Sequence, residues 1–304
     1  MQYSLSGTVL TKDLVTANGR VVASRGQIIG LAYLKALAAK APRGGRELPL
    51  FDTPLAESVL EAFDASPLQN LMGGESSRVL ASDALAEVRF PQPVWDELVA
   101  LRKEDEPRYQ HAIWSAVIAA HLFRAAMGSA PGIARLVGGA LTHDLGMRHA
   151  AGRLRFKREH LTRAEALSLE DHPLLGALLL ASVLGDAPAV HLALLHHSRG
   201  GFSYGRAGGE EPPLRELDLI SVASAFAALI APRSYRLQPY NPRGAVDQLV
   251  DDAMAGQFDL RAIRLLIRCL RGAKAQAELK FPAKPTGFRP PVNHHGVSRA
   301  SSSI

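Results

Sequence analysis

The amino-terminal residues switch from an alternating to a helical pattern of hydrophobic positions. Residues 2–10 and 20–29 alternate hydrophobic and polar side chains as strands do, and Asn18-Gly19 between them is a signal for a tight turn. From residue 31 to 41 the spacing becomes helical, with Leu31, Leu34 and Leu37 on one face. The pattern therefore predicts a small α+β module at the start of the chain.

The module is predicted to end in a linker. Residues 40–45 and 49–54 have the composition of loops, 55–65 follow a helical pattern, and 66–78 are rich in Gly, Ser and Pro. We therefore assign residues 1–78 to the amino-terminal module and its linker.

Beyond about residue 93 the helical period dominates the chain. Gly128 ends a long helix, and Thr162 is a suitable N-cap for another. The helices that the pattern predicts span 94–102, 108–127, 132–144, 163–169, 173–184, 187–197, 214–231, 245–254 and 260–270. We expect a mainly α fold, with a helical domain over 79–275. A disordered basic tail is expected over 276–304, where Pro, Gly and Ser accumulate.

Composition supports a helical protein of a reducing compartment. Hydrophobic residues make up 47% of the chain and aromatic residues only 6%, with many Ala and Leu, which favour helices. A single cysteine, Cys269, cannot form an internal disulfide, and it lies in an apolar helix, where we expect inert packing. The chain begins without a secretory signal pattern, so a cytoplasmic location is expected.

Neither membrane insertion nor binding to a nucleic-acid polymer is expected. The longest apolar stretches, 173–185 and 219–231, are too short to span a bilayer and are typical of buried helices. The net charge of +6 would attract phosphate groups. Part of that charge lies in the predicted tail, which weakens any argument for a nucleic-acid partner.

Candidate chemistry is concentrated between His143 and His197. His143 is followed directly by Asp144, His172 lies downstream, His196 and His197 are adjacent, and His111 lies on an earlier predicted helix. Any one of these could be a capping or core histidine. Together they form an inventory of imidazole and carboxylate ligands that suits Fe, Mn or Zn, because burying so many imidazoles without partners would be costly.

The order of these residues resembles the HD-GYP family of the HD metal-dependent phosphohydrolase superfamily. Beyond His111 and His143-Asp144, the resemblance includes residues 161–165, His172-Pro173 with Gly176, His196-His197 and Gln257-Phe258-Asp259. It covers roughly residues 95–271. It implies an all-helical bundle with a metal centre and hydrolysis of the cyclic dinucleotide c-di-GMP.

By the same resemblance, His111, His143 and Asp144 would hold one ion, and Asp144, His172, His196 and His197 a second, with Asp144 as the bridge. His143 and Asp144 would be the catalytic pair. Two divalent cations can clamp a phosphodiester and activate a water. Arg233 and Arg236 are candidates to bind the non-reacting phosphate.

The chain departs from the family pattern around the first ion. Ser224 stands where the family has an Asp ligand, Ala227 replaces the Asp of Asp-Ala-Leu, and Met147 replaces a Lys. Ser203-Tyr204-Gly205 stands for the Gly-Tyr-Pro that names the family, and Ser198 replaces a Glu. A neutral hydroxyl is a poor ligand for a divalent cation. Asp218, six residues before Ser224, would face another side of its helix.

Two interpretations therefore remain open. In the first, the protein holds one or two divalent ions (Fe, Mn or Zn) and hydrolyses a cyclic dinucleotide or another phosphoester with reduced or altered activity. In the second, catalysis is lost and the domain binds a ligand or a signalling protein. We expect metal binding, which the first interpretation requires. Asp144→Ala would separate the two interpretations, because it abolishes turnover only if the protein is an enzyme.

Overall fold

The computed structural model describes residues 7–42, 44–65, 68, 75–157, 162–197, 215–232 and 238–271. In this part of the chain the fold is mainly helical, with three short antiparallel strand pairs before the main helical region. The predicted fold class is therefore confirmed. The predicted tail over 276–304 lies outside the described residues, and the predicted domain boundaries stay predictions.

The amino-terminal module contains two strand pairs and a helix. β1 (Thr8–Val9) pairs with β4 (Ile28–Ile29), and β2 (Leu14–Val15) pairs with β3 (Val21–Ala23). The turn predicted at Asn18-Gly19 joins β2 to β3, and Gly19 has a φ of 87°, which glycine adopts without strain. Helix α1 (Leu31–Ala39) follows as predicted. The strands are shorter than the alternation suggested.

A third strand pair was missed by the sequence pattern. β5 (Glu47–Pro49) pairs with β6 (Arg89–Pro91), so that Leu48 lies opposite Phe90. Residues 49–54 were predicted to be a loop, which is wrong for this strand and for the short 3-10 helix η1 (Leu50–Asp52). Strands of three residues are too short to display an alternating period. The Trp95 indole N–H donates to the carbonyls of both Phe90 and Leu48, which fixes the pair.

Two helices link the strand pairs to the helical region. α2 (Ala56–Asp64) matches its prediction. α3 (Glu75–Ala86) begins inside the segment predicted as linker, so residues 75–78 are helical. Both helices pack against the long helix α5 (Glu106–Met127).

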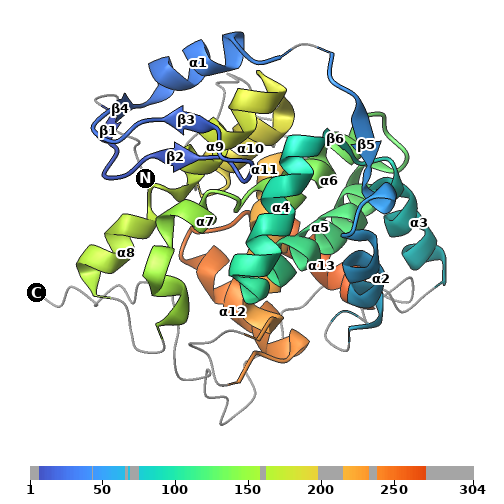
Figure 1. The fold of residues 1–304 in the computed structure, drawn as a ribbon. Coiled ribbons are helices and arrows are strands. Elements are labelled where there is room, and N and C mark those ends of the chain that lie inside the picture. Colours follow the sequence, from blue (N-terminus) through green and yellow to red (C-terminus); the bar gives the residue numbers. More distant parts are fainter. Residues whose placement is uncertain are drawn as a thin grey trace, which may run out of the picture.

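Helix α5 is the centre of the fold, and α4, α6, α11 and α13 also pack against it (Figure 1). The remaining helices are α4 (Gln92–Glu104), α6 (Ile133–Thr142), α7 (Met147–Ala150), η2 (Gly152–Phe156), α8 (Arg163–Leu169), α9 (His172–Leu184), α10 (Pro188–Leu195), α11 (Glu216–Ile230), α12 (Pro242–Met254) and α13 (Leu260–Arg271). Except for α7 and η2, which the sequence pattern did not predict, these bounds agree with the helical periods of the sequence to within a few residues.

Local capping explains where several helices begin and end. The Asp105 carboxylate accepts a hydrogen bond from the Arg108 amide at the start of α5, and Gly128, with a φ of 64°, ends that helix. Thr162 and Glu165 form a reciprocal capping box at the start of α8, as the predicted N-cap required.

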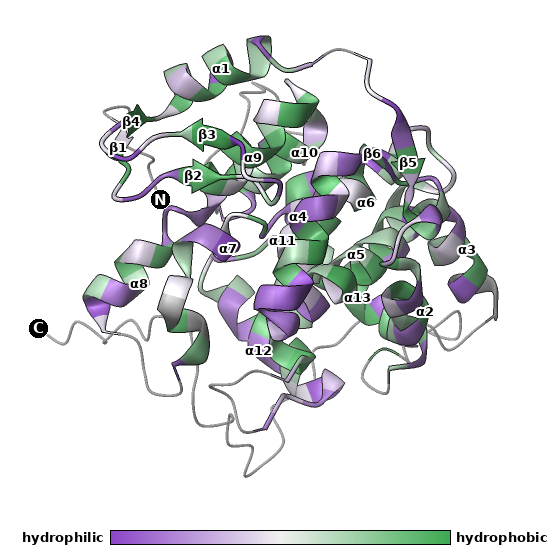
Figure 2. Ribbon diagram, in the orientation of Figure 1, coloured by the Kyte–Doolittle hydropathy of each residue, from purple (hydrophilic) through white to green (hydrophobic). Residues whose placement is uncertain are grey.

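Helix α9 is apolar and largely buried, and α10 is apolar apart from the exposed His191. Figure 2 shows hydrophobic residues concentrated on the inner helices and hydrophilic ones on the outer helices α8 and α12. Among the described residues, Arg163–Leu184 is long and apolar enough to cross a membrane by composition, and 61% of its window is buried. The buried residues of this stretch belong to α9, whereas α8 has none.

The amino-terminal module is bound to the helical region by a buried ion-pair cluster around Arg148, which we call the Arg148 cluster. The Arg148 guanidinium lies 3.0 Å from the Glu97 carboxylate and 2.9 Å from that of Glu104, and it donates to the Val15 carbonyl in β2. The other Glu97 oxygen accepts the Ala17 amide. Burial raises the pKa of Glu97, and the Arg148 charge opposes that rise.

A second contact joins the module to α9. The Arg20 guanidinium donates to the Ser182 hydroxyl at 2.6 Å and to the Ser182 carbonyl at 3.2 Å. Helix α1 and strand β3 also lie against α9 (Figure 1).

Candidate metal centre

The structure brings together all six residues that the sequence proposed as metal ligands. Their ligand atoms form two groups, each within 4.8 Å: Asp144 with His172, His196 and His197, and Asp144 with His111 and His143. We call the first the three-histidine site and the second the two-histidine site. Asp144 belongs to both, as expected of a bridging carboxylate. Their roles as ligands stay a prediction.

The side chains reach the centre from four helices. His111 lies on α5, His143 and Asp144 follow α6, His172 opens α9, and His196 and His197 follow α10. The end of α6, the start of α9 and the end of α10 therefore lie close together, and most of the candidate ligands belong to these helix ends.

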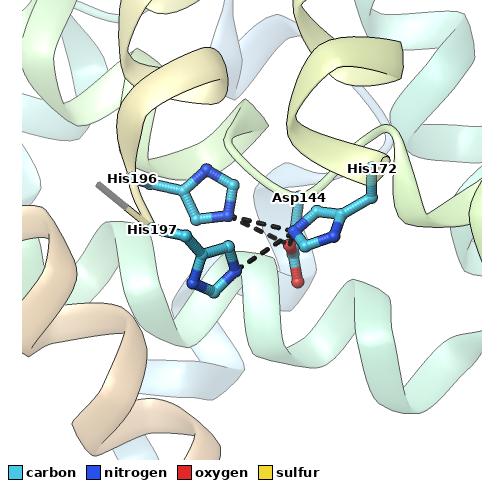
Figure 3. A group of neighbouring side chains, drawn as sticks. All are labelled: Asp144, His172, His196 and His197. Atoms are coloured by element: carbon cyan, nitrogen blue, oxygen red, sulfur yellow. Dashed lines mark hydrogen bonds and ion pairs between the residues drawn. The ribbon is translucent and has the colours of Figure 1, made fainter. Parts of the chain in front are cut away.

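In the three-histidine site the side chains point toward one another (Figure 3). Asp144 Oδ1 lies 3.2 Å from His172 Nε2 and 3.6 Å from His196 Nε2. His172 Nε2 is itself 3.2 Å from the Nε2 atoms of His196 and His197. Three ring nitrogens and a carboxylate oxygen therefore converge on a single small volume.

The other ring nitrogens show which atoms carry protons. Nδ1 of His143 lies 2.7 Å from the Ala140 carbonyl, Nδ1 of His172 lies 2.6 Å from that of Leu169, and Nδ1 of His196 lies 2.8 Å from that of Ala193. A carbonyl oxygen only accepts, so each Nδ1 must donate a proton. In the neutral imidazoles the Nε2 lone pairs then face the centre, which is the arrangement of a metal-binding histidine.

Burial disfavours protonation of His143, His196 and His197. It lowers the pKa of His143 to about 4, and it also lowers the pKa of His196. The pKa of His197 lies well below its ordinary value, because burial and then the neighbouring His196 and His172 disfavour a charge.

The carboxylate in the same cluster stays ionised. Burial alone would raise the pKa of Asp144, but the neighbouring His143, His172 and His196 outweigh burial and hold that pKa well below its ordinary value. A buried anion is thus held among neutral nitrogen donors, which is the donor set that a divalent cation requires.

The two-histidine site is built differently. His111 Nε2 lies 3.6 Å from Asp144 Oδ2, and the Ser224 hydroxyl on α11 lies 3.0 Å from His143 Nε2 and 3.3 Å from His111 Nε2. Ser224 therefore stands at the position where the resemblance requires an Asp ligand. Asp218 instead forms an ion pair with Arg215 at the start of α11, so it does not replace the missing carboxylate.

Arg108 is a residue of the centre that the sequence reasoning missed. Its NH1 atom lies 3.6 Å from Asp144 Oδ2, and its Nε lies 3.4 Å from the Asp105 carboxylate, with a side chain only 14% exposed. The available signal was its position three residues before His111, which places the two side chains on the same face of α5.

Gly146, two residues after Asp144, has a packing role at the centre. A Cβ at Gly146 would lie 2.0 Å from the His172 carbonyl oxygen and 2.4 Å from the Gly176 amide nitrogen. The turn after Asp144 thus touches the first turn of α9 backbone to backbone, which sets His172 beside Asp144.

Other proposed residues lie elsewhere or outside the described part. Cys269 is buried, and burial raises the pKa of its thiol to about 12, as inert packing requires. Met147 and Ala227 are both buried. Outside the described residues lie the predicted phosphate contacts Arg233 and Arg236, together with Ser198 and Ser203-Tyr204-Gly205.

The donor set of the three-histidine site fits a divalent ion. Three imidazoles and one carboxylate converge there, and because the Nδ1 atoms of His172 and His196 donate to backbone carbonyls, their Nε2 atoms face each other as acceptors. Such a ligand set suits Zn, Fe or Mn. The chain therefore contains a His/Asp cluster able to bind a metal, as the sequence predicted.

Comparisons with known proteins add a partial structural likeness. No protein-family model matches the chain, and no curated protein matches it in sequence. Among solved structures, the HD domain of the L. monocytogenes phosphodiesterase PgpH is similar, with 16% identity and a TM-score of 0.42 over 58% of this chain and 95% of that one. The chemistry of the site therefore follows from its own side chains.

Proposed function

We propose that the protein is a metal-dependent phosphohydrolase of the HD type. The observation that carries the proposal is the grouping of three imidazole Nε2 atoms with the Asp144 carboxylate in the three-histidine site, where His172 and His196 face Asp144 Oδ1 and His197 faces His172. Buried acceptor atoms that face one another without a proton between them cost free energy unless a cation binds between them. Such a cluster is therefore a candidate functional site.

Backbone carbonyls and neighbouring charges set the orientation and the charge of the groups in the centre. The carbonyls of Leu169 and Ala193 hold the rings of His172 and His196 in the tautomer that presents Nε2. The shifted pKa values keep His196 and His197 neutral and Asp144 charged at neutral pH. When bound, a divalent ion supplies Lewis acidity toward a phosphoryl oxygen and a water.

The motif order supports a finer proposal, that the protein is of the HD-GYP type and acts on a cyclic dinucleotide such as c-di-GMP. The Ser224 position agrees with that order, since this residue reaches both His111 and His143 in space. In this proposal Arg233 or Arg236 binds a phosphate group, and the protein works in the cytoplasm.

The replacement of a carboxylate ligand by Ser224 favours a second candidate, a catalytically inactive domain. On this proposal the centre still binds a metal, and the domain serves as a ligand-binding or partner-binding signalling module. The two candidates differ in turnover and agree on the metal.

Metal analysis tests the common part of the proposal. We expect protein purified without chelators to carry Fe, Mn or Zn, and His172→Ala to lose it. A matched control is His191→Ala, because His191 lies on α10 near His196 but is exposed and paired with Asp186. Wild-type protein that binds no metal even after addition of each ion would overturn the proposal.

Hydrolysis separates the two candidates. With the metal restored, the enzyme interpretation expects turnover of c-di-GMP or of a chromogenic phosphodiester, and Asp144→Ala should abolish it, since Asp144 belongs to both sites. Metal-loaded protein with no turnover above the Asp144→Ala background on either substrate, or on a phosphomonoester, supports the binding module instead.

A further inference from the structure

We infer that the centre is mononuclear: the two-histidine site holds no metal ion, and Ser224 and Arg108 occupy its place. The inference rests on the proposed metal centre and deepens it. It concerns the number of bound ions: the resemblance to the HD-GYP family implies two, and we infer one.

The first support is a closed hydrogen-bond chain in the two-histidine site. His143 donates its Nδ1 proton to Ala140, so its Nε2 accepts the Ser224 hydroxyl proton at 3.0 Å. The Ser224 oxygen then accepts from His111 Nε2 at 3.3 Å. Both Nε2 atoms are thus engaged with Ser224, one as acceptor and one as donor. A metal ion would have to break both hydrogen bonds.

The three-histidine site lacks such a chain. His172 and His196 both spend their Nδ1 protons on backbone carbonyls, and their Nε2 atoms face each other at 3.2 Å. A cation can bind between these two facing lone pairs. In the two-histidine site the Ser224 hydroxyl proton already occupies the lone pair of His143 Nε2.

The second support is the charge at Asp144. Its two oxygens are divided: Oδ1 faces His172 and His196, and Oδ2 faces Arg108 NH1 at 3.6 Å. A guanidinium is charged at every accessible pH. Arg108 therefore already supplies a positive charge on the side where a second ion would bind.

The position of Arg108 is fixed by its surroundings. Its Nε lies 3.4 Å from the Asp105 carboxylate, whose other contact caps α5, and its side chain is largely buried. A second divalent ion would then lie close to a fixed cation. Two divalent ions and the Arg108 guanidinium would then face only two carboxylates among the described groups, those of Asp144 and Asp105.

Counting bound Mn²⁺ tests the inference. We expect one equivalent per chain in wild-type protein, with the electron paramagnetic resonance spectrum of an isolated ion. His111→Ala should keep that equivalent, and His172→Ala should lose it. Ser224→Asp combined with Arg108→Ala should gain a second equivalent, with an exchange-coupled spectrum. The matched control, Ser224→Asn with Arg108→Ala, has the same shape without the added charge and should stay at one.

The outcomes separate this inference from the proposed function. Two equivalents in wild-type protein, or loss of the single ion on His111→Ala, would overturn the inference and leave the metal centre standing. No bound metal in wild-type protein would overturn the centre and the inference with it. If the double variants do not fold, the wild-type count and His111→Ala still decide.

Discussion

Two buried polar clusters lie close together in the chain and are built on opposite principles. The Arg148 cluster pairs each charge with its complement: the guanidinium meets Glu97, Glu104 and the Val15 carbonyl. The cluster around Asp144 instead gathers acceptors, since several ring nitrogens and a carboxylate face the same space. The first cluster is complete with protein atoms alone, and the second calls for an added cation.

The difference shows how a structural ion pair is distinguished from a binding site. Both clusters are buried and both contain shifted pKa values, so neither burial nor the shift identifies function. What identifies the binding site is the direction in which its N–H groups and lone pairs point. Around Asp144 the N–H groups of His143, His172 and His196 point outward to backbone carbonyls, and the lone pairs point inward.

The largest effect on folding should come from breaking the Arg148 cluster. Arg148→Ala leaves the Glu97 carboxylate buried without its cation, and we expect a loss of about 4 kcal/mol in the free energy of unfolding. Urea denaturation measures this loss. Metal content per folded chain should not change. A loss below about 1 kcal/mol, or a loss of metal with full stability, would contradict the contrast between the clusters.

A smaller effect is expected at Gly146, which lies between the two clusters. Gly146→Ala places a methyl group against the His172 carbonyl, and we expect a cost of about 3 kcal/mol together with weaker metal binding. Thermal unfolding and metal titration measure the two effects. Gly45→Ala is the control, because a Cβ there meets nothing within 4 Å. Unchanged metal affinity would show that the contact does not position His172.

A pH dependence of stability is expected at the edge of the Arg148 cluster. Burial, then the charges of Arg148 and Lys12, lower the pKa of His149 from 6.5 to about 3. Since the folded pKa lies below the unfolded one, this contribution is complete above pH 6.5 and is lost as pH falls toward 3. The slope is at most about 1.4 kcal/mol per pH unit.

Comparing wild-type protein with His149→Gln isolates that contribution. The variant should show a shallower loss of unfolding free energy between pH 6.5 and 4. Parallel curves would mean that His149 is not held neutral by the fold.

Helix positions and the ligand set followed from sequence because their signals are local or ordered. Thr162 with Glu165 and Gly128 mark helix ends through neighbours a few residues away. The ligands were found as an ordered series along the chain, and the fold brings them together as expected. The strands β5 and β6 were missed because their signal is a pairing between distant segments.

The details that set the number of ions depend on side-chain geometry. Ser224 was recognised as a missing ligand, but its contact with both His111 and His143 depends on where α11 crosses α5. Arg108 was missed because a charged residue near a helix start is usually a solvated side chain. Only the three-dimensional packing turns it toward Asp144.

The ring tautomers have a consequence for how the site tolerates mutation. His143, His172 and His196 are each oriented by the carbonyl of the residue three positions earlier, Ala140, Leu169 and Ala193. Because the partner is a main-chain atom, substitutions of those three side chains leave the support in place. Each of these candidate ligands is therefore oriented by the main chain of its own turn, and the side chains of Ala140, Leu169 and Ala193 take no part in setting its tautomer.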